Sequence, residues 1–195
     1  MAAAPSGAGT GAVSPPAAGG GVSACSALAI RHLTKLGHRR IALLGGVGTA
    51  QLSNTREQGY LDEMEKLGEE PYPMTVGEAA LDGEACISSL FAQLGGRPRP
   101  TALVAFNDLV ALGALRQLKR QGLRVPEDIA LMGCDNQFFA PYSDPPLTTL
   151  DLHIEETSRL AMNLLVSAQT ANLDGFAQHF KPTLIVRESC GFMLR

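Results

Sequence analysis

Polar side chains follow two of three short apolar runs, at the points where those runs stop. Asn107 and Asp108 follow TALVAF, Asp135 follows IALMGC, and a Gly45-Gly46 pair follows RIALL. An amide both donates and accepts hydrogen bonds, and an ionised carboxylate accepts them, so such groups can hold a small polar molecule. If the runs are neighbouring strands of a parallel sheet, the groups meet at one edge, where sheets of this kind bind their ligands.

Within this set, individual residues have competing interpretations. Asp108 is predicted to cap the following helix by accepting backbone N–H bonds, which leaves Asn107 to face the crevice. Asp135 is either a ligand contact or the first residue of an Asx-turn. Arg56 begins a helix after the first strand, and its fork of donors suits vicinal hydroxyls or a carboxylate. It could equally form a surface ion pair with Glu57 or Asp62.

The elements that would position these residues alternate along the chain. Helical spacing of apolar residues, closed by glycines, predicts helices at about 23–37, 53–68, 81–94 and 109–122. Short apolar runs predict strands at 40–46, 101–106 and 129–133, with a weaker one at 72–76. Because the apolar runs are continuous and do not alternate with polar residues, the strands should be covered by helices on both faces. The predicted fold is α/β, with a doubly wound parallel sheet.

Composition limits the classes of function. The net charge is −3 over 195 residues, which gives no basic footprint for nucleic acid, so this chain alone should bind DNA poorly. The four cysteines are scattered without a C-x-x-C pair, and they are interpreted as reduced thiols of a cytoplasmic protein that holds no metal or cofactor. No apolar run is long enough for a membrane helix, and the N-terminus does not resemble a signal peptide.

Catalytic motifs are also missing from the sequence. GGVGTA at 45–50 lacks the Gly-Lys-Ser/Thr of a phosphate loop, and no G-x-S-x-G nucleophile elbow occurs. Residues 1–22 are almost entirely small residues and proline, which predicts a disordered tail before a folded domain at 23–195. The chain is therefore expected to bind a ligand and not to be an enzyme.

An ordered set of motifs resembles one protein family. LTKLGHRRIALLGG, the R-x-x-GY of Arg56 to Tyr60, TALVAFNDLVALGALRQLKRQGLRVPEDIALMGCDN and PPLTTL occur in the order and spacing of the sensor domain of LacI/GalR transcription regulators. The resemblance runs from about residue 23 to 191. It implies a periplasmic-binding-protein-like (type I) fold of two α/β lobes, a small sugar-like effector between them, and a homodimer.

The resemblance also implies roles for individual residues. Arg56 matches the arginine that grips effector hydroxyls, Asn107 the asparagine of the ND motif, and Asp135 the aspartate after the third strand. Family members often place an aromatic ring before the helix near residue 81, but this stretch has Glu78 and no aromatic. Phe106 or Phe138 is expected to supply the apolar contact instead.

The chain resembles mainly the C-terminal lobe of the family's sensor. A helix-turn-helix headpiece and a first lobe are not recognised before residue 23, so operator DNA would be bound only through a headpiece that this sequence does not contain. Residues 147–181 correspond to the segment that normally crosses to the first lobe. Its amphipathic helix would have to repack, pair with another chain, or expose an apolar patch.

The sequence leaves three hypotheses for function. The first is an effector-binding sensor domain of a regulator, in which ligand binding alters operator affinity. The second is a solute-binding protein of transport, which shares the lobed fold. The third is a fragment that does not sense ligand and acts by association with full-length relatives.

Overall fold

The computed structural model describes residues 19–45, 51–72, 83–166 and 181–192. Its centre is a parallel sheet with the strand order β1-β2-β3, formed by β1 (Ile41–Leu44), β2 (Ala102–Ala105) and β3 (Ala130–Met132). Ile41 is paired with Ala102, and Ala102 in turn with Ala130, so the three strands end close together at one edge. The predicted strands at 40–46, 101–106 and 129–133 are confirmed.

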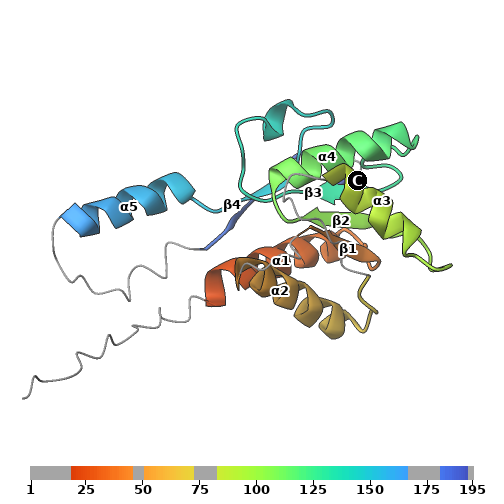
Figure 1. Cartoon of the computed structure of the whole chain (residues 1–195), viewed down its shortest axis with the longest axis horizontal. Coiled ribbons are helices and arrows are strands. Elements are labelled where there is room, and N and C mark those ends of the chain that lie inside the picture. The colour runs from red at the N-terminus through yellow and green to blue at the C-terminus, as the bar shows by residue number, and fades with distance from the viewer. Residues whose placement is uncertain (1–18, 46–50, 73–82, 167–180, 193–195) are drawn as a thin grey trace, which may run out of the picture.

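Helices cover both faces of this sheet, as the sequence predicted (Figure 1). One face carries α1 (Gly19–Lys35) and α2 (Gln51–Leu67), and the other carries α3 (Gly83–Ala92) and α4 (Asp108–Arg120). Alternate strand residues enter the two cores: Leu103 and Ala105 pack with α3 and α4, whereas Ala102 and Val104 pack with α1 and α2. Strands that are buried on both faces read as continuous apolar runs for this reason.

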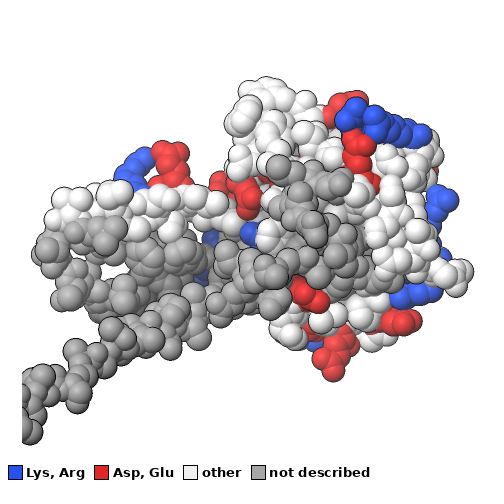
Figure 2. Space-filling view, viewed as in Figure 1, with Lys and Arg blue, Asp and Glu red and all other residues white. Residues whose placement is uncertain are grey.

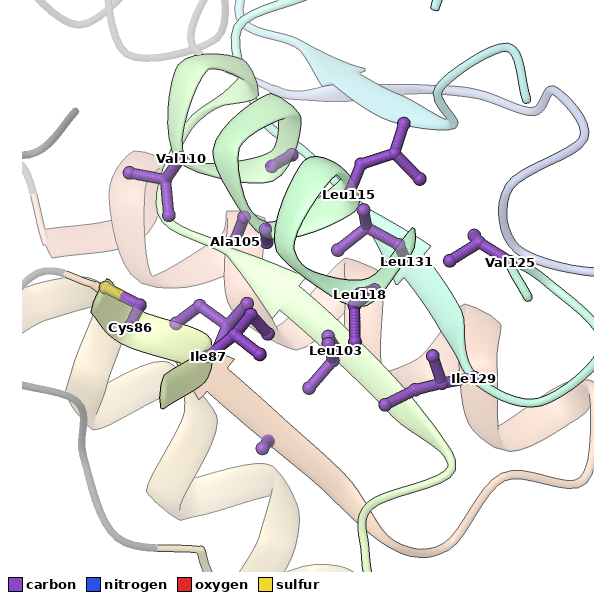
Figure 3. Close-up of a cluster of buried hydrophobic side chains, with 14 of the residues drawn as sticks. Cys86, Ile87, Leu103, Ala105, Val110, Leu115, Leu118, Val125, Ile129 and Leu131 are labelled. Atoms are coloured by element: carbon purple, nitrogen blue, oxygen red, sulfur yellow. The ribbon is translucent and has the colours of Figure 1, made fainter. Parts of the chain in front are cut away.

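The core on the α3–α4 side is built from medium-sized aliphatic residues (Figure 3). Leu118 of α4 lies beside Leu103 and Val110 near Ala105, and Leu115 and Leu131 belong to the same core. The buried face of α4 also includes Ala111 and Ala114, while Leu109 and Leu112 are 42% and 39% exposed. The row of leucines at every third position is thus divided between the core and the surface.

The chain leaves the sheet through a two-stranded antiparallel ribbon, β4 (Thr149–Asp151) and β5 (Thr183–Ile185). Before the ribbon, the segment forms a short 3₁₀ helix, η1 (Ala140–Tyr142), and then runs beside β3, where Met132 bridges to Thr148. The helix α5 (Ile154–Val166) follows β4 and stands apart from the lobe formed by α1 to α4 (Figure 1). In the single chain this helix does not repack on the lobe, and its Met162 and Val166 are 60% and 80% accessible.

The ends of some predicted elements differ from those in the structure. The first helix begins at Gly19, a few residues before the expected start of the fold. Tyr72 is not part of a strand, and the rest of the predicted strand at 72–76 lies outside the described residues, as does Glu78. Four cysteines are free and buried, as predicted.

Candidate functional site

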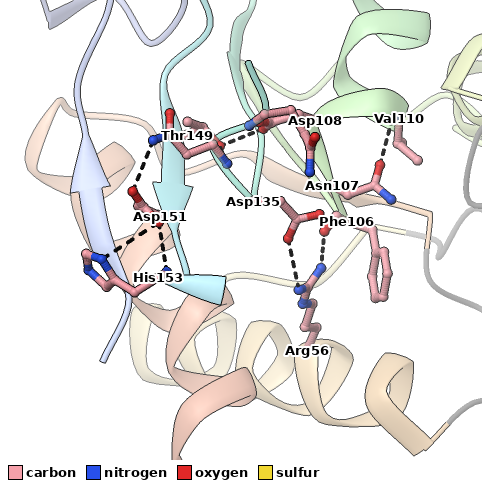
Figure 4. A network of polar contacts seen from close by, with 11 residues as sticks. Arg56, Phe106, Asn107, Asp108, Val110, Asp135, Thr149, Asp151 and His153 are labelled. Carbon is pink, nitrogen blue, oxygen red and sulfur yellow. Dashed lines mark hydrogen bonds and ion pairs between the residues drawn. The ribbon is translucent and has the colours of Figure 1, made fainter. Parts of the chain in front are cut away.

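Arg56 lies beneath the ends of the strands, where α2 holds it against the residues that follow β2 and β3 (Figure 4). A terminal nitrogen of its guanidinium donates to the carbonyl of Phe106, and the other lies 3.6 Å from a carboxylate oxygen of Asp135. The guanidinium carbon is 4.2 Å from the centre of the Phe106 ring, which is a cation–π contact. Arg56 is 9% exposed and pairs with neither Glu57 nor Asp62, so the interpretation as a surface ion pair is wrong.

The guanidinium of Arg56 retains an unused donor. Its Nε is buried and has no hydrogen-bond partner. Buried polar groups in native proteins are nearly always paired, so an orphaned donor at a strand-end site needs an explanation.

Asp135 holds its carboxylate in this position through an unusual backbone. Its φ is +104° and that of Asn136 is +50°, both in the left-handed half of the Ramachandran plot. Burial raises the pKa of Asp135, while the Arg56 charge opposes that rise. The predicted pair of Arg56 and Asp135 therefore does come together, from two elements far apart in the sequence.

The capping role predicted for Asp108 belongs to Asn107. Asn107 is the N-cap of α4, where its side-chain oxygen accepts from the N–H of Val110 at 2.8 Å. Asp108 is the first helical residue, and its side chain is fully buried. An extended residue immediately before the first helical turn is placed to cap it, and the helix begins one residue earlier than the prediction assumed.

The carboxylate of Asp108 joins three segments at the strand ends (Figure 4). It accepts a hydrogen bond from the Thr149 hydroxyl at 2.6 Å and another from the N–H of Gln137 at 2.7 Å. Burial raises the pKa of Asp108, and these two donors oppose the rise. A Cβ at Gly133 would lie 2.1 Å from the Asp108 oxygen, so only glycine leaves room for this carboxylate.

A pocket of about 590 Å³ lies between these strand ends and the start of α5. Asp135, Asn136, Asp151 and His153 line one side of it, and the first turns of α5 line the other. Asn136 donates to Asp151 at 3.0 Å and accepts from Arg187 at 2.9 Å. Sequence reasoning missed Asp151 and Arg187, because their positions depend on the return of the chain through β4 and β5.

The two aromatic candidates have different surroundings. Phe106 is half-buried against Arg56 at the strand end. Phe138 is 82% exposed and stacks edge-on against Phe139, with ring centres 5.5 Å apart. The structure thus groups Phe106 with Arg56 and Asp135, and it leaves Phe138 at the surface.

Charged groups elsewhere on the described residues are mostly paired with opposite charges. Figure 2 shows blue and red atoms side by side over the lobe on the face in view, and mostly uncharged atoms over α5. Arg116 and Arg120 both bind Glu84, and Lys119 binds Asp144. In the part of the chain that the structure describes, no cluster of three or more His, Cys, Asp and Glu could hold a metal ion, and no helix is long and apolar enough to cross a membrane.

Comparisons with known proteins agree with this geometry. Residues 30–190 match the model of the periplasmic binding protein-like domain. The HTH-type transcriptional repressor PurR of Haemophilus influenzae is 35% identical over 169 residues, which cover 83% of this chain and 49% of PurR. The chain thus spans about half the length of this relative.

Solved structures give the same result. A sugar-binding LacI-family regulator of Escherichia coli, complexed with phosphate, has a TM-score of 0.74 and 26% identity, with 87% of this chain and 61% of that one covered. The cellobiose complex of the regulator CelR has a TM-score of 0.67 and 30% identity, over 88% and 52%. All three of these proteins are named as transcription regulators and not as enzymes. The chain therefore belongs to the periplasmic-binding-protein-like domain family, in the form that LacI-family transcription regulators carry.

Proposed function

We propose that this chain provides the effector-binding lobe of a LacI-type transcription regulator, and that Arg56 and Asp135 bind the effector. The observation that carries the proposal is the buried Arg56, which has an unused Nε donor and lies beside Asp135 and Phe106 at the strand ends. A guanidinium with a neighbouring carboxylate offers donors and acceptors together, which matches the vicinal hydroxyls of a sugar. The ring of Phe106 adds an apolar surface.

The charges of the adjoining pocket favour a neutral, hydroxyl-rich effector. Four carboxylates line it, from Asp135, Asp151, Glu155 and Glu156, against one arginine, Arg159. An anionic effector would be repelled there, whereas hydroxyl groups can donate to the carboxylates. A sugar or polyol is accordingly the proposed class. The cellobiose complex of CelR shows that this fold accommodates such a ligand in another protein.

In the intact regulator, effector binding in this lobe would alter affinity for operator DNA as a coupling between two sites. DNA contact is assigned to a helix-turn-helix headpiece outside this sequence, and the protein is proposed to act in the cytoplasm as a homodimer. The membership of a family of transcription regulators supports these assignments.

Ligand-induced stabilisation tests the proposal directly. Thermal unfolding of the chain is measured with a panel of neutral mono- and disaccharides, polyols, nucleosides and sugar acids. A ligand that binds the folded state raises its melting temperature by mass action. We expect a neutral sugar or polyol to do so, and we expect both Arg56→Gln and Asp135→Asn to abolish the increase.

The chain contains a matched control pair. Arg124 and Asp128 form an exposed ion pair at 2.7 Å, away from the strand ends, so Arg124→Gln should leave the ligand effect unchanged. A panel without any stabilising compound would contradict the proposal, and so would an increase that survives both site variants.

A further inference from the structure

Two cysteines from distant parts of the sequence meet beneath the strand ends. Cys25 lies on α1 and Cys134 lies two residues after the end of β3, and both are almost completely buried, at 2% and 3% exposure. Their thiols are hydrogen-bonded to each other. Thiols that hydrogen-bond to each other face one another, as the two sulfur atoms of a disulfide must.

The same two thiols line a small cavity together with Arg56 and Phe106. The cavity is only about 10 Å³, so an oxidant must displace part of its lining to reach the sulfur atoms. The Arg56 charge stabilises a thiolate there, and the Asp135 charge opposes it. A cationic side chain next to a thiol is the usual feature of a reactive cysteine.

The hydrogen bond makes the two thiols unequal. It lowers the pKa of Cys25, with Arg56 acting in the same direction, and it raises the pKa of Cys134 well above its ordinary value. Cys25 is therefore the nucleophile of the pair, and Cys134 keeps its proton and can attack in a second step.

We propose that Cys25 and Cys134 are a peroxide-sensitive dithiol that closes to an intramolecular disulfide under the strand ends. In the first step the Cys25 thiolate attacks one oxygen of hydrogen peroxide. An S–O bond forms, the O–O bond breaks, and the departing hydroxide takes up a proton as water. Cys134 then attacks the sulfenic sulfur: the S–S bond forms, the S–O bond breaks, and hydroxide leaves with the Cys134 proton as a second water. Two electrons pass from the sulfur pair to the peroxide.

The other two cysteines have different surroundings and serve as internal controls. Cys86 is the one cysteine among the described buried residues of the α3–α4 core. Cys190 lies 3.4 Å from Nε2 of His32 and donates to the carbonyl of Arg187. Neither has a thiol as a hydrogen-bond partner among these contacts.

The test treats the whole chain with hydrogen peroxide at a dose that leaves its circular dichroism unchanged. The protein is then denatured, alkylated and analysed by intact mass and peptide mapping. We expect two thiols to escape alkylation, a cross-linked peptide that joins Cys25 to Cys134, and full recovery of four alkylated thiols after treatment with dithiothreitol. Cys86→Ser should form the same disulfide.

Variants separate the two steps of the reaction. In Cys134→Ser the reaction should stop at the Cys25 sulfenic acid, which dimedone labels, and Cys25→Ser should show no such label at Cys134. Arg56→Gln should slow oxidation and shift its rate profile to higher pH, since the neighbouring cation is lost. Four alkylatable thiols after peroxide, a disulfide through Cys86 or Cys190, or a bond between two chains would each overturn the proposal. The mapping of the unmodified chain decides the matter even if a serine variant does not fold.

Discussion

At the scale of single residues, the site contains a conflict between binding geometry and backbone preference. Asp135 has a φ of +104°, a conformation that residues with a Cβ rarely adopt and that costs about 1–3 kcal/mol. Stability alone would favour glycine at this position. An aspartate there fits a demand for its carboxylate next to Arg56.

Asp135→Gly is therefore expected to raise the free energy of unfolding by about 1 kcal/mol, because it releases the backbone strain, while it abolishes ligand binding. Chemical denaturation and the ligand-induced thermal shift measure the two effects separately. If the variant were clearly less stable than the parent chain, the left-handed backbone would not be a source of strain.

Asp135→Asn separates the charge from the strain, because asparagine keeps the side-chain shape. The pKa of Asp135 in the folded state is raised above its ordinary value of 3.8, so the fold favours the protonated side chain. This stabilisation is fully present below pH 3.8 and is lost as the pH rises through the folded-state pKa. The variant should thus match the parent chain in acid and exceed it in stability near neutral pH.

Residue roles at the strand ends were only partly predictable from the sequence. Arg56 and Asp135 could be predicted as site residues because each lies shortly after a strand in the sequence, and the ends of the strands converge in a parallel sheet. The cap was assigned to Asp108 and not to Asn107 because the cap depends on where the helix begins, and sequence patterns do not fix a helix start to within one residue. Asp151 and Arg187 could not be found, since their contacts are long-range.

At the scale of elements, α3 and α4 cross at a point where two glycines meet. A Cβ added at Gly83 would lie 1.9 Å from the carbonyl oxygen of Val110, a backbone atom that cannot turn aside. At Gly113 the nearest atom would be 3.0 Å away. The close approach positions the start of α4, which holds Asn107 and Asp108 at the strand end.

Gly83→Ala should consequently destabilise the chain by about 2 kcal/mol or more, because the two helices must move apart. Gly113→Ala is the matched comparison. The contact that its new Cβ makes at 3.0 Å is offset by the better helix propensity of alanine, worth about 1 kcal/mol, so the net change in stability should be small. Urea unfolding of both variants checks the order, and an equal loss would contradict this account of the crossing.

The positions of helices and strands were easier to predict than which side of each helix is buried. Strands and helices followed from continuous apolar runs and glycine stops, but the leucines of α4 were not all core residues. Leu109 and Leu112 face outward because Val110, Ala111 and Ala114 occupy the buried side. Helical spacing alone cannot distinguish two apolar stripes on one helix.

At the scale of the whole molecule, the exposed leucines suggest how two chains would associate. Leu109 and Leu112 lie on α4, and the exposed Phe138 and Tyr142 lie on the segment that is held to α4 by the Asp108 and Lys119 contacts. Apolar side chains gathered on neighbouring elements commonly form an interface. We propose that the chain dimerises and that this surface joins the two subunits.

Leu112→Glu should convert the dimer into monomers, because a charge would be buried at the interface without a partner. Light scattering after size-exclusion chromatography measures the mass in solution. Met162→Glu places the same charge on the exposed face of α5 and should leave the dimer intact. The opposite result would assign the interface to α5.

The ribbon after the sheet connects α5 mechanically to the site. The N–H of Gly133 donates to the carbonyl of Thr148 at 2.9 Å, and the N–H of Asp135 donates to that of Leu150 at 2.8 Å. The strand that leads into α5 is therefore bonded to the backbone that carries the Asp135 carboxylate. A movement of α5 would therefore be passed along β4 to the backbone of Asp135. It would change the deuterium exchange rate of the Asp135 amide, which can be measured. A partner that covers the far end of α5, at Met162 and Val166, would change that rate without touching the pocket.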